Sequence, residues 1–156
     1  MSAEESGMGN GPQLLHDLVL LDIGCGRNKK QGFIGLDISR DSNADIIAIA
    51  SSLPLKGEMV SEINCSHLGE HLCPDEAQQF FDEIFRVLKP GGVARLKIDR
   101  DWSKSMLLKK DPGHKYRYSV NEIKNMVQKF SFKKVKQKIY LFDFKLRNKI
   151  IVELRK

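Results

Sequence analysis

The sequence predicts an α/β fold built on a mostly parallel sheet with one antiparallel strand. Three observations support this prediction. Short apolar runs recur through the first hundred residues, a segment that begins with proline has apolar residues at helical spacing, and two β-rich runs close the chain. Strands that alternate with helices and end in a hairpin are typical of such a sheet.

The first part of the chain supplies four strands and one helix. The runs 18–23, 33–38, 45–50 and 60–65 are apolar or alternate apolar with polar residues, which indicates strands. Pro74 fits the first turn of a helix, and apolar residues at helical spacing continue from it to Leu88, before the KPGG sequence at 89–92 ends the helix. Because only residues 24–32 separate the first two strands, the first crossover helix is expected to be reduced or missing.

The second part adds a strand, a helix and a terminal hairpin. The run 93–98 reads as a strand. Ser119 with Glu122 three residues later forms a capping box, which predicts that a helix begins there. The runs 133–142 and 149–154 are rich in β-forming residues and close enough to pair as an antiparallel hairpin.

Length and composition bound the organisation of the chain. Its 156 residues fit one domain, expected over 14–156, after an acidic lead over 1–13 that is expected to be disordered. No apolar run approaches the roughly 20 residues that a membrane span needs, and the lead lacks the features of a secretory signal, so a cytoplasmic location is expected. The three cysteines cannot all pair within one chain, which favours free thiols.

Charge is distributed unevenly along the chain. Residues 1–100 contain 10 Lys/Arg and 15 Asp/Glu, whereas residues 101–156 contain 16 and 5. A basic C-terminal part suggests an anionic partner such as nucleic acid, and the stretch 109–118 interleaves cations with aromatic rings in a way that suits stacking on bases. Lys134, Lys136 and Lys138 alternate with other residues, which is also how edge strands avoid pairing with other chains.

Glycines and a carboxylate follow the first two predicted strands. Gly24 and Gly26 end the first strand, and Asp37 ends the second. Parallel sheets bind ligands at the carboxyl ends of their strands, where glycine lets the backbone approach a ligand and a carboxylate can accept both hydroxyls of a ribose. Lys29 stands where the dinucleotide-binding fingerprint requires a third glycine, so a nicotinamide dinucleotide is disfavoured.

In this order and spacing, the motifs resemble those of class I S-adenosylmethionine-dependent methyltransferases. The resemblance rests on the sequences LLDIGCG at 20–26, Asp37, SLPL at 52–55, HLGEHL at 67–72 and FRVLKPGG at 85–92. It is strongest toward a small branch in which a short loop joins the first two strands. It implies a Rossmann-like fold, S-adenosylmethionine as the cofactor and methyl transfer to an acceptor that the sequence does not identify.

The resemblance also implies which residues bind the cofactor. It would put the amino-acid end over Gly24, Cys25 and Gly26 with Asp22 near the ammonium, and the adenine between Ile38 and Leu53. The full set expected to bind the cofactor is Asp22, Gly24, Cys25, Gly26, Asp37, Ile38, Ser52, Leu53 and His67. No catalytic residue is assigned, although His67, Asp99 and His114 lie on loops where a general base could act.

Two departures leave a second interpretation open. The family often has an acidic residue that binds the adenine amine in the register of Ile49, and the first crossover helix is short or absent. Together with the basic tail, these departures allow a catalytically inactive methyltransferase-like binding module or subunit, which the retained Asp22, Gly24, Gly26 and Asp37 oppose.

The sequence also bears on metal binding and on assembly. The sequence HLGEH at 67–71 has the H-x-x-E-H spacing of a zinc peptidase and is flanked by Cys65 and Cys73, but it follows a strand rather than lying on a long helix, so no metal is expected. A sheet with a vestigial first helix is expected to expose apolar surface, which predicts a homodimer or a heteromeric partner.

Overall fold

The computed structural model describes residues 18–100, 113–142 and 145–156, which form one mixed seven-stranded sheet. The strands are β1 (Leu20–Ile23), β2 (Ile34–Asp37), β3 (Ile46–Ile47), β4 (Val60–Ser66), β5 (Leu88–Asp99), β6 (Phe132–Phe142) and β7 (Lys145–Arg155). Their order across the sheet is β3-β2-β1-β4-β5-β7-β6, and β7 alone runs antiparallel to its neighbours β5 and β6. The predicted α/β fold with a C-terminal antiparallel hairpin is confirmed.

The helical elements of the described residues are η2 (Gly69–His71), α1 (Pro74–Val87) and α2 (Val120–Met126). Pro74 occupies the first turn of α1, as the sequence predicts. The predicted capping box opens α2, where the Glu122 N–H donates to Ser119 Oγ at 3.2 Å and the Ser119 N–H donates to Glu122 at 2.8 Å. No described helix is long and apolar enough to span a membrane.

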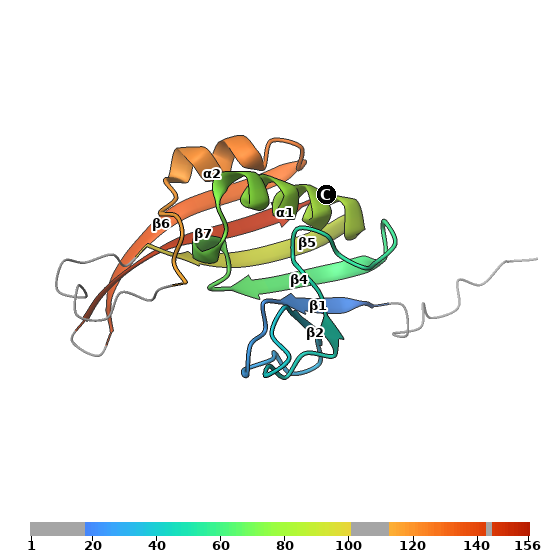
Figure 1. Cartoon of the computed structure of the whole chain (residues 1–156). Helices are drawn as coiled ribbons and strands as arrows, with labels where there is room; N and C mark the ends of the chain where they lie inside the picture. Colours follow the sequence, from blue (N-terminus) through green and yellow to red (C-terminus); the bar gives the residue numbers. More distant parts are fainter. Residues whose placement is uncertain (1–17, 101–112, 143–144) are drawn as a thin grey trace, which may run out of the picture.

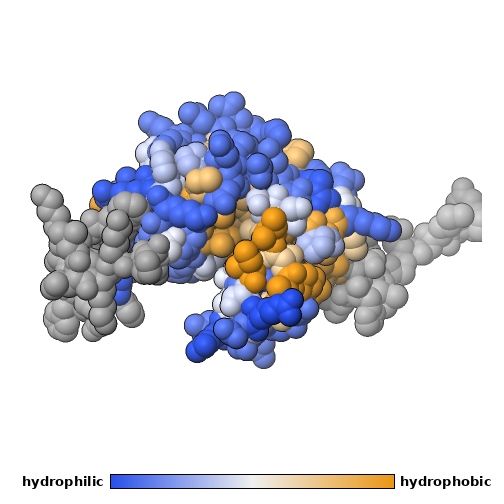
Figure 2. Space-filling view, viewed as in Figure 1, coloured by the Kyte–Doolittle hydropathy of each residue, from blue (hydrophilic) through white to orange (hydrophobic). Residues whose placement is uncertain are grey.

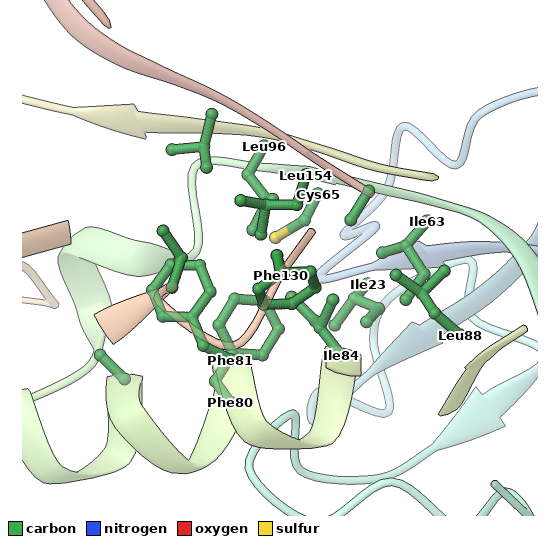
Figure 3. Packing of buried hydrophobic residues seen from close by; sticks show 14 of the residues in the cluster. Ile23, Ile63, Cys65, Phe80, Phe81, Ile84, Leu88, Leu96, Phe130 and Leu154 are labelled. Atoms are coloured by element: carbon green, nitrogen blue, oxygen red, sulfur yellow. The ribbon is translucent and has the colours of Figure 1, made fainter. Parts of the chain in front are cut away.

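Both α-helices lie on the same face of the sheet (Figure 1). Phe80, Phe81 and Ile84 of α1 are almost fully buried and point toward the strands, where Ile63 and Leu96 receive them (Figure 3). All three predicted free cysteines are confirmed as unpaired thiols, and Cys65 packs within this core. Burial of these side chains is the main force that holds the helices on the sheet.

The opposite face, which we call the open face, carries no helix among the described residues. The connections from β1 to β2, β2 to β3 and β3 to β4 contain no α-helix. On β5 the residues that alternate with the buried Ala94 and Leu96 include the exposed Arg95 and Lys97. The sequence analysis expected exposed apolar sheet surface. On β5 the exposed positions are polar, as in a sheet solvated on one side, whereas Ile34 of β2 and Ile47 of β3 are apolar and 40% and 49% exposed.

Candidate cofactor pocket and adjoining polar cluster

The loop after β1 depends on two glycines with positive φ. Gly24 has φ +68°, and its N–H donates to the Leu36 carbonyl of β2 at 2.7 Å. Its Cα also faces Leu68, whose Cβ would lie 3.2 Å from a Cβ at position 24. Gly26 has φ +51° and continues the turn. The backbone conformation at both positions strongly favours glycine, because other L-residues are strained there.

Asp37 joins this loop to the end of β2. Its Oδ2 accepts the Gly26 N–H at 2.8 Å, and its Oδ1 accepts the Ser39 N–H at 2.9 Å. The side chain is only half-buried, and each carboxylate oxygen can accept a further hydrogen bond. The arrangement fixes the orientation of the carboxylate and leaves acceptor capacity toward solvent.

A pocket of about 300 Å³ opens at the carboxyl ends of β1 and β2. Its lining comes from the loop after β1, the end of β2, the segment after β3, η2 with its flanking residues, the first turn of α1 and the segment before α2. It comprises Gly24, Leu36, Asp37, Ile38, Ala48, Ile49, Ala50, Ser51, Leu68, His71, Leu72, Glu76 and Lys115. In Figure 2 an apolar patch lies between the part of the molecule that contains α1 and the smaller part that contains β1 and β2. Ile38 and Ile49 are 69% and 48% exposed, so the pocket offers apolar walls to a flat ligand.

Three of the predicted cofactor-binding residues, Gly24, Asp37 and Ile38, line this pocket. Gly26 adjoins it through its hydrogen bond to Asp37. Ser52 is exposed and lies outside the lining, where Ser51 takes its place. Leu53 is buried in the core, with its N–H donating to Glu83 at 2.7 Å.

Asp22 and Cys25 lie behind the loop rather than on the pocket wall. Asp22 is buried, and its two oxygens accept the Lys30 N–H at 2.8 Å and the Asn64 side-chain amide at 2.6 Å. Its carboxylate therefore secures the returning end of the loop. Cys25 is also buried, and burial, followed by the negative charges of Asp37 and Asp22, raises the pKa of its thiol.

The walls that the sequence analysis missed are Leu68, His71 and Leu72, together with Glu76 and Lys115. The first three belong to the HLGEHL sequence, which supports the family resemblance and also has the spacing of a metal motif, but in which the sequence predicts only His67 to bind the cofactor. Its signal as a pocket wall lies in its position, because it directly follows β4 and leads through η2 into α1. Lys115 comes from a distant part of the chain and pairs with Glu76 at 3.1 Å.

His67 lies outside the pocket in a polar cluster at the ends of β4 and β5. Its Nδ1 is 3.3 Å from Glu70 Oε1 and 3.7 Å from Asp99, while its Nε2 is 2.9 Å from Lys149 Nζ. Glu70 is 1% exposed, and Asp99 donates its backbone N–H to Glu70 Oε2 at 3.2 Å. Burial raises the pKa of Glu70, but the imidazole of His67 and the backbone N–H groups of Glu70 and Asp99 outweigh burial and hold that pKa below its usual value.

The described part of the predicted nucleic-acid stretch is mostly engaged in packing. Tyr118 is fully buried and donates its hydroxyl to the Leu72 carbonyl at 2.8 Å, and burial raises its pKa well above the usual value. Tyr116 donates its hydroxyl to Glu122 at 2.7 Å. Arg117 is exposed, and Lys109 and Lys110 lie outside the described residues. The two tyrosine rings thus serve the core and α2.

Comparisons with known proteins agree with this geometry. The family described as "Methyltransferase domain" matches residues 21–96, a range that contains the glycine loop, Asp37 and the HLGEHL sequence. No curated protein sequence matches the chain.

Solved structures share the fold at low sequence identity. A SAM-dependent methyltransferase from Archaeoglobus fulgidus is 18% identical with a TM-score of 0.70, over 89% of this chain and 86% of that protein. One from Methanosarcina mazei is 19% identical with a TM-score of 0.65, over 92% and 94%. Phosphoethanolamine N-methyltransferase 2 from Haemonchus contortus, solved with S-adenosylhomocysteine, is 14% identical with a TM-score of 0.70, and the match covers 89% of this chain but 48% of that protein.

Proposed function

We propose that this chain, which has a methyltransferase family domain at residues 21–96 on the class I S-adenosylmethionine-dependent methyltransferase fold, is an active enzyme that methylates an acceptor still to be identified. The observation that carries the proposal is the carboxylate of Asp37, held by the Gly26 N–H at 2.8 Å on the wall of a pocket at the carboxyl ends of the strands. Ligands of open α/β sheets bind at this edge.

The pocket residues fit the chemical groups of S-adenosylmethionine. Asp37 has acceptor capacity for the ribose hydroxyls, and Gly24 leaves its backbone uncovered for the amino-acid end. Ile38 and Leu72 offer apolar surface to the adenine faces. The cofactor supplies a methyl group on a cationic sulfur, and the chain's task is to hold the acceptor in line with that group.

Ile49 and Ser51 determine which hydrogen-bond acceptors the pocket wall offers to the amine of the adenine. Ile49 lies on the pocket wall where the family often has an acidic residue, so no carboxylate at this position receives the adenine amine. The Ser51 hydroxyl, two residues further along the same wall, is a weaker acceptor. We therefore expect cofactor binding that is weaker than in relatives with the acidic residue but still measurable.

Calorimetry with S-adenosylmethionine and S-adenosylhomocysteine tests the proposal. We expect one site per chain, with binding weakened in Asp37→Ala and unchanged in Asp41→Ala, an exposed carboxylate in the loop after β2. If wild-type protein binds neither compound at millimolar concentration, the enzyme interpretation fails and the inactive binding module replaces it. Methyl transfer from labelled cofactor into fractionated RNA, protein and metabolites then identifies the acceptor class.

We also propose that the open face binds a nucleic acid strand. Residues that share a register across β4, β5, β7 and β6 point to the same side of the sheet. On the open face these positions contain eight cations, Arg95, Lys97, Lys134, Lys136, Lys138, Arg147, Lys149 and Arg155, against three carboxylates, Glu62, Asp99 and Glu153. The rings of Phe132 and Tyr140 occupy the same side of β6 and offer stacking surface.

Removal of positive charge from the open face is the sharpest test. Lys97, Lys136 and Lys138 are exposed, and Lys138 lies 5.5 Å above the Tyr140 ring. Replacing all three by Ala should weaken binding of single-stranded RNA and reduce the slope of log affinity against log salt by about 2. The control replaces Lys56, Lys124 and Lys129 by Ala, which removes the same amount of positive charge at positions away from the open face. Absence of RNA binding at low salt, or equal loss in both triple variants, contradicts the proposal.

A further inference from the structure

We propose that Glu70, His71 and His114 form a binding site for a divalent transition-metal cation at the rim of the pocket. Each residue offers one ligand atom, and the three atoms lie within 4.8 Å of one another. Two imidazoles and one carboxylate leave coordination positions open, and this ligand set suits ions such as Zn²⁺, Mn²⁺ or Fe²⁺. The proposal revises the expectation of no metal that the sequence context suggested.

The buried carboxylate of Glu70 is the first observation behind this proposal. The residue is 1% exposed, and its Oε1 has no hydrogen-bond partner among the described residues. Its neighbour is His67 Nδ1, an ion-pair contact at 3.3 Å that does not meet hydrogen-bond geometry. A buried carboxylate oxygen that accepts no hydrogen bond is costly, so a bound water or cation beside Glu70 would be stabilising.

The orientation of His71 is the second observation. Its Nδ1 is 2.9 Å from the Gly113 carbonyl. Because a carbonyl oxygen only accepts, Nδ1 must carry the proton, which leaves the lone pair of Nε2 as the metal-binding atom of the neutral ring. A hydrogen bond from the other ring nitrogen to a backbone carbonyl is the usual support of a metal-bound histidine.

Backbone hydrogen bonds hold His114 close to Glu70. The Glu70 carbonyl accepts the N–H groups of Lys115 at 2.8 Å and Tyr116 at 3.2 Å, so the segment that contains His114 is tied directly to the turn that contains Glu70. The rings of His71 and His114 meet edge to face with centroids 4.9 Å apart. Two backbone bonds and one side-chain bond therefore hold the three ligands together without a metal, as a preorganised site requires.

A second group, His67, Glu70 and Asp99, also shares Glu70 but is the poorer candidate. His67 already has Lys149 Nζ at 2.9 Å from its Nε2, and a lysine ammonium there would repel a cation. Neither Cys65 nor Cys73 joins any potential ligand group of the described residues, so the zinc site considered from the sequence, with two cysteines and two histidines, does not form.

The place of this cation suggests its use. His71 lines the pocket, so a cation bound to its ring would lie beside the proposed cofactor site, where the acceptor has to meet the methyl group. There the ion would bind an acceptor oxygen and lower its pKa, which favours hydroxyl-bearing acceptors. This last step rests on the proposed methyl transfer, whereas the binding site itself does not.

Titration of chelator-treated full-length protein with Zn²⁺ and with Mn²⁺, in the absence of any cofactor, tests the site. We expect one equivalent to bind. His114→Gln and His71→Gln should each weaken binding by at least 10- to 100-fold, the range that even supporting residues of metal sites contribute. His67→Gln and the exposed control Asp75→Asn should bind as wild type does. Because cofactor calorimetry is a separate measurement, failure here is distinguishable from failure of the proposed function.

Wild-type protein supplies a readout that survives if a variant fails to fold. The chain has four histidines, so ¹⁵N-histidine spectra are simple to assign. Zn²⁺ should move the ring-nitrogen signals of His71 and His114 and leave those of His67 in place. The proposal is overturned if no cation binds at millimolar concentration, if His114→Gln binds normally, or if His67→Gln loses binding as severely as His114→Gln.

Discussion

The N–H of Gly26 donates a 2.8 Å hydrogen bond to Oδ2 of Asp37, so the carboxylate expected to hold the cofactor ribose also closes the glycine loop. Support of the loop and the proposed binding of the ribose therefore depend on the same side chain. A variant that removes the carboxylate changes both, and the two effects have to be measured on the same protein.

Asp37→Ala should weaken S-adenosylmethionine binding by roughly a hundredfold or more, since hydrogen bonds to a charged group contribute about 1.5–3 kcal/mol each and 1.4 kcal/mol is tenfold. It should also lower the melting temperature, because the Gly26 and Ser39 N–H groups lose their acceptor. Asp37→Asn retains one acceptor oxygen, so its cofactor affinity and its melting temperature should both fall less than those of Asp37→Ala. Calorimetry and thermal unfolding on each variant, with exposed Ser52→Ala as the control, give the comparison. Unchanged cofactor affinity in Asp37→Ala, after correction for folded fraction, would remove this residue from the binding site.

Gly24→Ala and Gly32→Ala separate backbone strain from side-chain crowding. Both glycines have positive φ, +68° and +80°, and each alanine should cost about 1–2 kcal/mol of stability for that reason. Only at Gly24 would the new Cβ meet a neighbour, Leu68 Cβ at 3.2 Å, whereas nothing lies within 4 Å at Gly32. We expect Gly24→Ala to be the less stable variant by chemical denaturation and the only one with weakened cofactor binding. Equal effects of the two variants on cofactor affinity would contradict this.

Ile49→Asp tests the departure from the family pattern. A carboxylate on the pocket wall would accept a hydrogen bond from the adenine amine, and about 0.5–1.5 kcal/mol corresponds to a 2- to 10-fold gain in cofactor affinity. Ile47→Asp is the matched control, because Ile47 is 49% exposed against 48% for Ile49 and does not line the pocket. Cofactor titration of both variants should show tighter binding in the first alone. A gain in neither variant would mean that the adenine lies elsewhere.

Glu70 links stability to acid pH. Its folded pKa is lowered from the ordinary value of 4.5, so the stabilisation is present above pH 4.5 and is lost as the pH falls through the folded pKa. In Glu70→Gln the free energy of unfolding should therefore depend less steeply on pH below about 4.5 than in wild type. Urea unfolding at a series of pH values between 3 and 7 measures this. Parallel profiles for the two proteins would show that the carboxylate does not titrate with folding.

Periodicity and turn residues made most of the fold predictable. The strand and helix positions followed from alternation, from Pro74 and from the capping box at Ser119, because each of these signals is local. The position predicted as a strand over 45–50 forms strand pairs only at Ile46 and Ile47, since β3 is an edge strand whose continuation turns along the pocket. On β5 the alternation of Arg95 and Lys97 with buried neighbours predicts polar exposed positions, whereas the missing crossover helix predicts exposed apolar surface near β1 and β2.

The pocket was only partly predictable because its walls come from separate parts of the chain. Gly24 and Asp37 are marked by position at strand ends. Leu53 and Leu68 are both apolar residues near such ends, and nothing local in the sequence tells which one enters the core and which one faces the ligand. Pairing of Lys115 with Glu76 depends on the docking of a distant segment. The homodimer or heteromeric partner expected from exposed apolar surface stays a prediction.

Because one face of the sheet is open, adjacent residues of one strand are under different evolutionary constraints. Along β5 the buried Leu96 must keep its shape to pack in the core beneath α1, while Lys97 next to it is exposed on the open face. Substitutions at the first kind of position are limited by stability, and those at the second by solubility and by whatever the face binds. Adjacent residues of β5 and β7 can thus diverge at different rates, and a new partner can be acquired on this side without rebuilding the core.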